Sequence, residues 1–216
     1  MSGHVSDVVT AAVLAFVGFR LVTGVRHMFT ADGRSLWRNV VGGIGWRHIW
    51  PVPFVLTVVV VLADLLVRVP GLRWGWWTAF GGQGNPVFGT NTSTTGTVWE
   101  WLIPLVFISM LIPALPLFAF AEERMFRRGA EGWDGRRRTL KVVQFGLAHA
   151  LIGIPIGTAF ALSAGGAYFM TVYLRSFRVH GDPAVAEIES ARAHTAYNGI
   201  IVVVVLLVVL LDAFAA

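Results

Sequence analysis

The stretch IIVVVVLLVVLL, residues 200–211, decides the fold class, because a helix formed from it is apolar on every side. With its neighbours it belongs to a mostly apolar run from about His194 to Phe214. A helix needs about 20 mostly apolar residues to cross a bilayer, and this run has that length. The C-terminal part of the chain is therefore predicted to span a membrane.

The composition of the whole chain indicates the same solvent. Hydrophobic residues make up 56% and charged residues 13% of the 216 residues, and the mean hydropathy is +0.68. A single globular core could not hide this much apolar surface from water. The net charge of +5 comes from basic residues clustered between apolar runs, which indicates membrane topology and argues against nucleic-acid binding. The lack of cysteine excludes disulfides, thiolate nucleophiles and cysteine-ligated metals.

Four more apolar runs precede the last one, at residues 8–25, 52–69, 99–121 and 142–174. The fourth is too long for one crossing and carries Gly153, Pro155 and Gly157 near its middle, so it is expected to split there into two spans. We therefore expect one integral membrane domain, residues 1–216, built as an all-α polytopic bundle of about six transmembrane helices.

Basic residues predict the orientation of these spans. Lys and Arg concentrate in residues 26–50, 122–141 and 175–193, which are alternate connections and are therefore expected to face the cytoplasm. Both termini are then expected outside, and the N-terminus lacks the basic residues of a signal peptide. Trp74, Trp76, Trp77, Trp99 and Trp101 would form an aromatic belt at the outer surface.

Polar residues gather at one depth in this topology. Asp182 and Pro183 are a strong helix start, so the last helix is expected to begin in the cytoplasmic connection and continue into the membrane. His194 and Asn198 then share one face of that helix, at i and i+4.

Two further elements lie at a similar depth. Glu122 and Glu123 close the third span, and His149 lies roughly 10 Å below the cytoplasmic rim at 1.5 Å per residue. The polar site is therefore expected to be shallow and to face the cytoplasm.

Structural roles compete with functional ones for several of these residues. Glu123 is four residues before Arg127 and predicts a surface ion pair, whereas Glu122 has Phe126 at that spacing and no such partner. For His149, an ionisable group inside a span, function is the default reading, and a hydrogen bond between helices is the alternative.

Other polar residues are expected to be structural. Asp64 can pair with Arg68 at i+4, and His27, His48 and His180 fall in connections and give no functional indication.

A carboxylate near two imidazoles and an amide can carry out hydrolysis. The Glu would act as general base on a water, one His would hold that water or protonate the leaving amine, and a second His with Asn would donate to an oxyanion. Glu122, His149 and His194 would also suit a single divalent metal such as zinc, and the pattern leaves metal-free and metal-dependent chemistry open. H-E-x-x-H and G-x-S-x-G motifs are absent from the chain.

Three short motifs occur in order on successive predicted helices. EERMFR (122–127) fits E-E-x-x-x-R, FGLAH (145–149) fits F-x-x-x-H, and HTAYN (194–198) fits H-x-x-x-N. Together they resemble the CPBP family of intramembrane proteases, also called the CAAX prenyl protease type II or abortive-infection family. The resemblance covers residues 115–215.

The resemblance implies a membrane-embedded endopeptidase that opens to the cytoplasm. Glu122 would be the catalytic glutamate, His149 would help to hold the water, and His194 and Asn198 would stabilise the oxyanion. The supporting residues of the motifs would be Glu123, Arg127 and Phe145. Members are often labelled metalloproteases, although a glutamate-activated water without metal is also proposed for them.

The chain departs from the family in two ways. Arg128 stands where a glycine often follows the first motif, and members commonly have more spans than the number expected here. Substrate entry could therefore differ.

Two functions from different classes are carried forward. The first is a protease of this family in a bacterial plasma membrane, acting on a peptide or membrane-anchored protein, with the lipid bilayer as its other partner. The second is a non-catalytic polytopic membrane protein, transporter-like or a scaffold or immunity module, whose buried His and Glu residues bridge helices.

Overall fold

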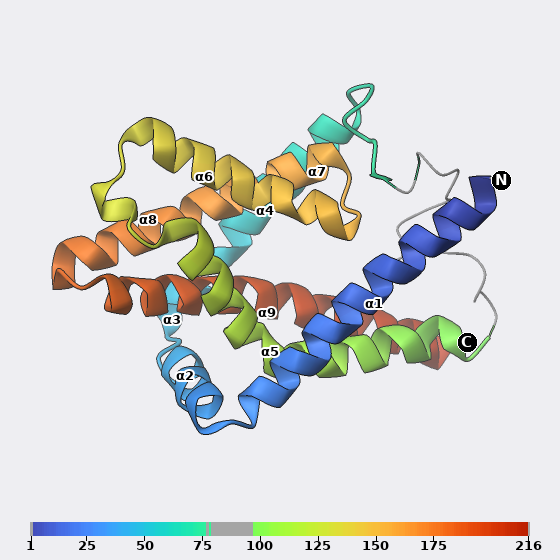
Figure 1. Cartoon of the computed structure of the whole chain (residues 1–216), viewed down its shortest axis with the longest axis horizontal. Coiled ribbons are helices and arrows are strands. Elements are labelled where there is room, and N and C mark those ends of the chain that lie inside the picture. The colour runs from blue at the N-terminus through green and yellow to red at the C-terminus, as the bar shows by residue number, and fades with distance from the viewer. Residues whose placement is uncertain (1, 77, 79–96, 216) are drawn as a thin grey trace.

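The computed structural model describes residues 2–76, 78 and 97–215, and these are helical with short connections and no strand among them (Figure 1). The helices are α1 (Ser2–Met28), α2 (Ala31–Val41), α3 (Trp46–Ile49), α4 (Val52–Val67), α5 (Trp99–Arg127), α6 (Gly135–Ala148), α7 (Ile156–Ala161), α8 (Ser163–His180) and α9 (Pro183–Ala215). Two 3₁₀ turns, η3 (Ala130–Gly132) and η4 (His149–Ile152), follow α5 and α6.

Four helical segments in the described part of the chain are long and apolar enough to cross a membrane. They are Ala11–Met28, Trp46–Val67, Pro104–Gly132 and Pro183–Leu211. Large apolar side chains are exposed on these segments, as at Val204 and Leu207 of α9, which suits a lipid solvent. The expected all-α class is confirmed, and the four segments are consistent with an integral membrane protein.

The long run 142–174 is interrupted where the sequence predicts. Gly153 has φ of 90°, a left-handed conformation that glycine adopts without a Cβ penalty, and Pro155 precedes α7. The chain therefore turns back, and α8 packs along α6 (Figure 1). Neither α6 nor α8 is among the four candidate spans.

The last helix is continuous, as predicted. The side chain of Asp182 accepts a hydrogen bond from the backbone N–H of Ala184 at 2.7 Å, and α9 then runs without a break from Pro183 to Ala215. It packs against α5 and α8 and crosses the molecule, and it ends on the same side of the view as the start of α1 (Figure 1).

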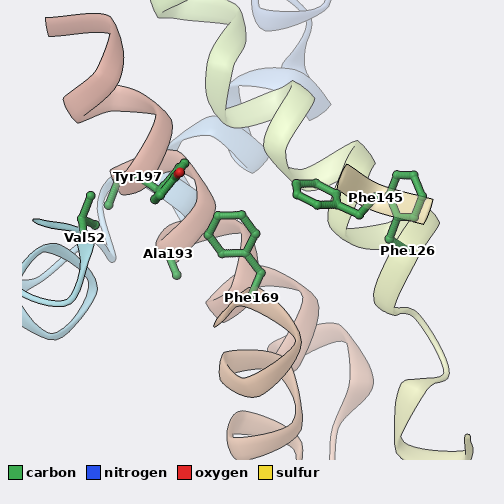
Figure 2. Close-up of a cluster of buried hydrophobic side chains, with 7 residues drawn as sticks. Val52, Phe126, Phe145, Phe169, Ala193 and Tyr197 are labelled. Carbon is green, nitrogen blue, oxygen red and sulfur yellow. The ribbon is translucent and has the colours of Figure 1, made fainter. Parts of the chain in front are cut away.

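An aromatic core joins α4, α5, α6, α8 and α9 near the polar end of this bundle (Figure 2). Its fully or nearly fully buried members are Val52, Phe126, Phe145, Phe169, Ala193, Ala196 and Tyr197. The rings of Phe126 and Phe145 meet edge to face at 5.5 Å, and those of Phe145 and Phe169 do so at 5.9 Å. This packing fixes the helices that carry the motif residues.

The Trp-rich connection can be described only in part. Trp77 and residues 79–96 lie outside the described residues, so the predicted aromatic belt is not tested there.

Candidate functional site

The site forms where the last turn of α5 meets α9. Successive residues on a helix point about 100° apart, so the adjacent glutamates Glu122 and Glu123 face different surroundings. Glu123 is fully buried, whereas the side chain of Glu122 keeps 36% of its surface exposed. On α9, Ser190 and His194 are one turn apart and face Glu123.

Glu123 is the centre of a buried polar bridge between the two helices. Its Oε1 accepts from Arg127 Nη1 at 2.9 Å and from His194 Nδ1 at 2.8 Å, and its Oε2 accepts from Ser190 Oγ. Ser190 Oγ is also 2.9 Å from the carbonyl oxygen of Phe169, which ties α8 to the bridge.

Arg127 is buried with its partner, which corrects the expectation of a surface ion pair. Both side chains have no exposed surface. The guanidinium also donates from Nη2 to the carbonyl oxygen of Gly166 at 3.3 Å and lies 4.2 Å from the centre of the Phe145 ring. Burial follows because α6, α8 and α9 close over the end of α5, which helix periodicity alone does not reveal.

The partners of Glu123 define the state of His194. A carboxylate paired with an arginine is acceptor-only, so we assign the proton on the Nδ1 of His194 to the hydrogen bond with Glu123. In the neutral imidazole, Nε2 is then the acceptor nitrogen. Phe169 stacks on one face of the His194 ring, with the ring centres 4.3 Å apart and an interplanar angle of 21°.

Glu122 faces the other nitrogen of the same imidazole. Its Oε2 lies 3.8 Å from His194 Nε2, a distance too long for a direct hydrogen bond. That oxygen is enclosed and has no hydrogen-bond partner among the described residues, although the side chain as a whole reaches the surface. Glu122 and His194 therefore face each other across a short gap, and the Glu122 side chain also reaches the surface.

His149 and Asn198 lie further from this pair. His149 caps α6, and its Nδ1 is 2.9 Å from the carbonyl oxygen of Phe145. The Phe145 ring packs against the imidazoles of both His149 and His194, with ring centres 5.1 and 5.5 Å apart. Asn198 is one turn past His194 and partly buried. Within the described residues no hydrogen bond joins either of them to Glu122.

The predicted metal ligands do not fit a three-ligand site in this arrangement. Glu122 and His194 face each other, but among the described residues no group of three His, Cys, Asp or Glu side chains gathers closely enough to hold an ion. Catalytic zinc usually takes three protein ligands. His149 does not join Glu122 and His194 as a third ligand, because its ring packs against Phe145.

Sequence reasoning missed two participants in this site, Ser190 and Phe169. Ser190 is four residues before His194 on a helix whose start Asp182 predicts. The i, i+4 spacing could therefore have placed Ser190 on the same face as His194. Phe169 carries no sequence signal. His48, which was expected to fall in a connection, is instead buried in α3, with its Nε2 3.1 Å from Glu189 Oε2 and outside this site.

Comparisons with family models, with curated proteins and with solved structures returned no match to this chain.

Proposed function

We propose that the chain is an intramembrane endopeptidase of the CPBP type, with residues 115–215 as its catalytic core and about six membrane crossings. It would hydrolyse a peptide bond in a peptide or membrane-anchored protein near the cytoplasmic face of a bacterial plasma membrane, with both termini outside. The placement of Glu122 opposite an anchored His194 carries the proposal.

The gap between these two side chains suits one water molecule. Atoms 3.8 Å apart can both lie within about 2.8 Å of a water placed to one side of the line between them. Glu122 Oε2 takes a proton from that water as general base, while the oxygen attacks the carbonyl carbon of the substrate. The same carboxyl then gives this proton to the amide nitrogen as the C–N bond breaks, which leaves a carboxylic acid and an amine as products.

The other motif residues support this step. Glu123, Arg127 and Ser190 hold the His194 ring, so that its Nε2 keeps a constant position near the reacting atoms. Stabilising the oxyanion needs the imidazolium form of His194, protonated on both nitrogens before the water attacks. Nε2 then donates to the developing oxyanion and keeps its proton throughout, with Asn198 as the second donor. His149 supports the site indirectly, because it packs against the Phe145 ring and that ring also contacts the His194 imidazole.

A glutamine at position 122 tests the proposal, because it keeps the shape and removes the base. Membranes from cells producing the chain would be incubated in H₂¹⁸O, and new peptide termini would be identified by mass spectrometry. We expect ¹⁸O-labelled carboxyl termini with the unchanged chain and with Asp64→Asn, an exposed carboxylate outside the site, and none with Glu122→Gln. Cleavage that persists in Glu122→Gln would sink the assignment of Glu122.

The bridge itself favours the second function. Glu123 has three partner atoms, Arg127 Nη1 on its own helix and Ser190 Oγ and His194 Nδ1 on α9, and this link between α5 and α9 needs no reaction. If the unchanged chain cuts nothing in this experiment, a transporter-like, scaffold or immunity module becomes the better account. His149→Ala should then lower stability by about 0.5 to 1.5 kcal/mol, the usual net contribution of one hydrogen bond, because its Nδ1 is 2.9 Å from the carbonyl oxygen of Phe145 four residues earlier on the same helix.

A further inference from the structure

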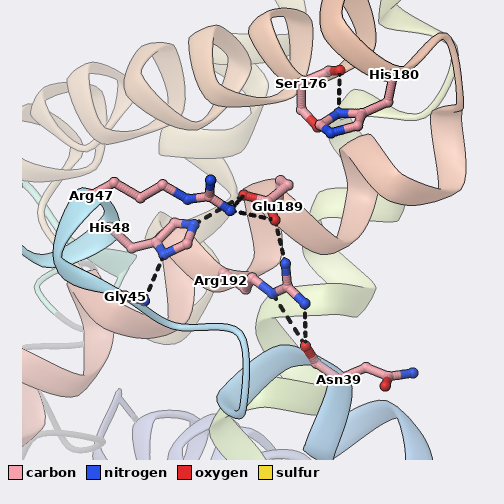
Figure 3. Close-up of polar contacts among 8 residues, drawn as sticks. All are labelled: Asn39, Gly45, Arg47, His48, Ser176, His180, Glu189 and Arg192. Atoms are coloured by element: carbon pink, nitrogen blue, oxygen red, sulfur yellow. Dashed lines mark hydrogen bonds and ion pairs between the residues drawn. The ribbon is translucent and has the colours of Figure 1, made fainter.

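A second polar cluster lies on another face of α9, one turn before His194 (Figure 3). Here it is called the Glu189 cluster, and it consists of Arg47, His48, Glu189 and Arg192. Arg47 Nη2 donates to both carboxylate oxygens of Glu189, at 3.1 and 3.0 Å, and His48 Nε2 is 3.1 Å from Oε2. Arg192 Nη1 donates to Oε1. Two arginines thus share one carboxylate, and the cluster keeps an excess positive charge.

The inner half of the cluster is rigid. Arg192 also donates to the backbone oxygen of Asn39 at 2.8 and 3.2 Å, and Gly45 N donates to His48 Nδ1 at 3.0 Å. A Cβ on Gly43 would lie within 2.1 to 2.2 Å of the Arg192 guanidinium, so the turn between α2 and α3 closes directly around it. Glu189 therefore stays paired with Arg192 even when the Arg47 side chain moves away.

The outer half of the cluster reaches the surface. The side chain of Arg47 is 70% exposed although it bonds Glu189. Trp46 beside it is 75% exposed, and Trp50 and Phe54 follow at i+4 spacing with their rings 6.2 Å apart. This aromatic row starts the candidate span Trp46–Val67, and indole rings favour the headgroup level of a bilayer.

The surrounding segment is basic. Residues 26–50 contain four arginines and one aspartate, a net charge of +3 with His neutral. Arg34 and Arg38 are one turn apart on α2 and both are exposed. The segment connects the candidate spans Ala11–Met28 and Trp46–Val67, and α2 and α3 follow the end of α1 in Figure 1. We therefore expect it to lie at one surface of the membrane.

We propose that Arg47 binds the phosphate of an anionic phospholipid headgroup, while Trp46 and Trp50 lie at the headgroup level and the exposed Arg38 of α2 adds positive charge to the same connection. An exposed guanidinium suits phosphate through bidentate hydrogen bonds, and a basic surface attracts anionic lipid. Arg47 turns from Glu189 to the phosphate, and Arg192 and His48 keep Glu189 paired. This site is separate from the hydrolytic one and does not depend on the proposed peptidase activity.

The test is a lipid titration of the purified full chain in detergent. Phosphatidylglycerol or phosphatidylcholine would be added, and bound lipid would be counted by native mass spectrometry, with the thermal midpoint measured alongside. We expect tighter binding of phosphatidylglycerol and, in Arg47→Gln, a loss of about fivefold in that affinity, which corresponds to one arginine at a membrane surface.

Arg68→Gln is the matched control, because Arg68 is equally exposed and lies at the other end of α4. It should leave the affinity unchanged. Equal losses in Arg47→Gln and Arg68→Gln would overturn the proposal, as would equal affinity for the two lipids or the same stabilisation by inorganic phosphate alone.

A second variant keeps the test valid if Arg47→Gln does not fold. Arg38→Gln leaves every contact of Glu189 in place, and it should also weaken phosphatidylglycerol binding by up to about fivefold. Unchanged binding in Arg38→Gln would overturn the proposal.

Discussion

Two ion pairs in this molecule have the same sequence spacing and opposite surroundings. Glu123–Arg127 and Asp64–Arg68 are both an acid followed four residues later by an arginine on a helix, with N–O distances of 2.9 and 2.7 Å. The first pair is completely buried, whereas the side chains of the second are 56% and 71% exposed. Helical spacing therefore predicts that a pair forms, but only its surroundings decide what the pair contributes.

The reason lies in the cost of removing charges from water. Asp64 and Arg68 lie at the end of the candidate span Trp46–Val67, where we expect them to reach interfacial water. An exposed pair gains little because water screens it, so its loss is small. A buried pair has already lost its hydration, and removing one partner leaves an uncompensated charge in the interior. The buried pair therefore stabilises the site at one end of α5, whereas the exposed pair contributes little to the stability of α4.

The largest expected effect is in Arg127→Gln. Loss of the guanidinium leaves the Glu123 carboxylate buried without its cation, so we expect the free energy of unfolding to fall by about 3 to 5 kcal/mol. Thermal unfolding in detergent, followed by circular dichroism, measures the change. A decrease no larger than that of an exposed arginine would contradict the buried bridge.

Ser190→Ala should have an intermediate effect. It removes one hydrogen bond to the Glu123 carboxylate while Arg127 and His194 remain, so we expect a loss of about 1.5 to 3 kcal/mol, as for hydrogen bonds to charged groups. The same unfolding measurement tests this. Ser109→Ala is the control, since that hydroxyl bonds only its own helix, at the carbonyl oxygen of Leu105.

The exposed pair should couple weakly. A double-mutant cycle of Asp64→Ala and Arg68→Ala is expected to give a coupling energy of about 0.3 to 0.5 kcal/mol, and less at high salt. A coupling energy above that of a buried hydrogen bond would remove the contrast between the two pairs.

Glu122→Gln should change stability least, by no more than about 0.5 kcal/mol, because the described structure shows no hydrogen bond to its carboxylate. Equal unfolding temperatures for Glu122→Gln and the unchanged chain are the expected result. This outcome separates Glu122 from its neighbour Glu123, and a large loss would mean that Glu122 also holds helices together.

Much of the fold was predictable because its causes are local. The apolar runs, the break at Gly153 and Pro155, and the start of α9 at Asp182 and Pro183 all depend on residues near in sequence. The structure bears out the break and the start of α9, and four of the six expected spans correspond to helical segments long and apolar enough to cross a membrane among the described residues.

The site was predictable only in part. The motifs placed Glu122 and His194 together, and they meet at 3.8 Å. They gave no indication that His149 would lie behind Phe145, or that Ser190 and Phe169 would hold the bridge. Such contacts depend on how α5, α6, α8 and α9 pack, and that packing joins residues far apart in the chain.

The sequence by itself determined that this chain is helical, that its runs are apolar enough for a membrane, and which acids have an arginine one turn away. These properties follow from composition and from the 3.6-residue period of a helix. Only the tertiary structure decided which glutamate is enclosed, which one reaches the surface, and that the neglected His48 joins α3 to α9. Burial and partnership arise when distant helices close over a side chain, and no local pattern encodes them.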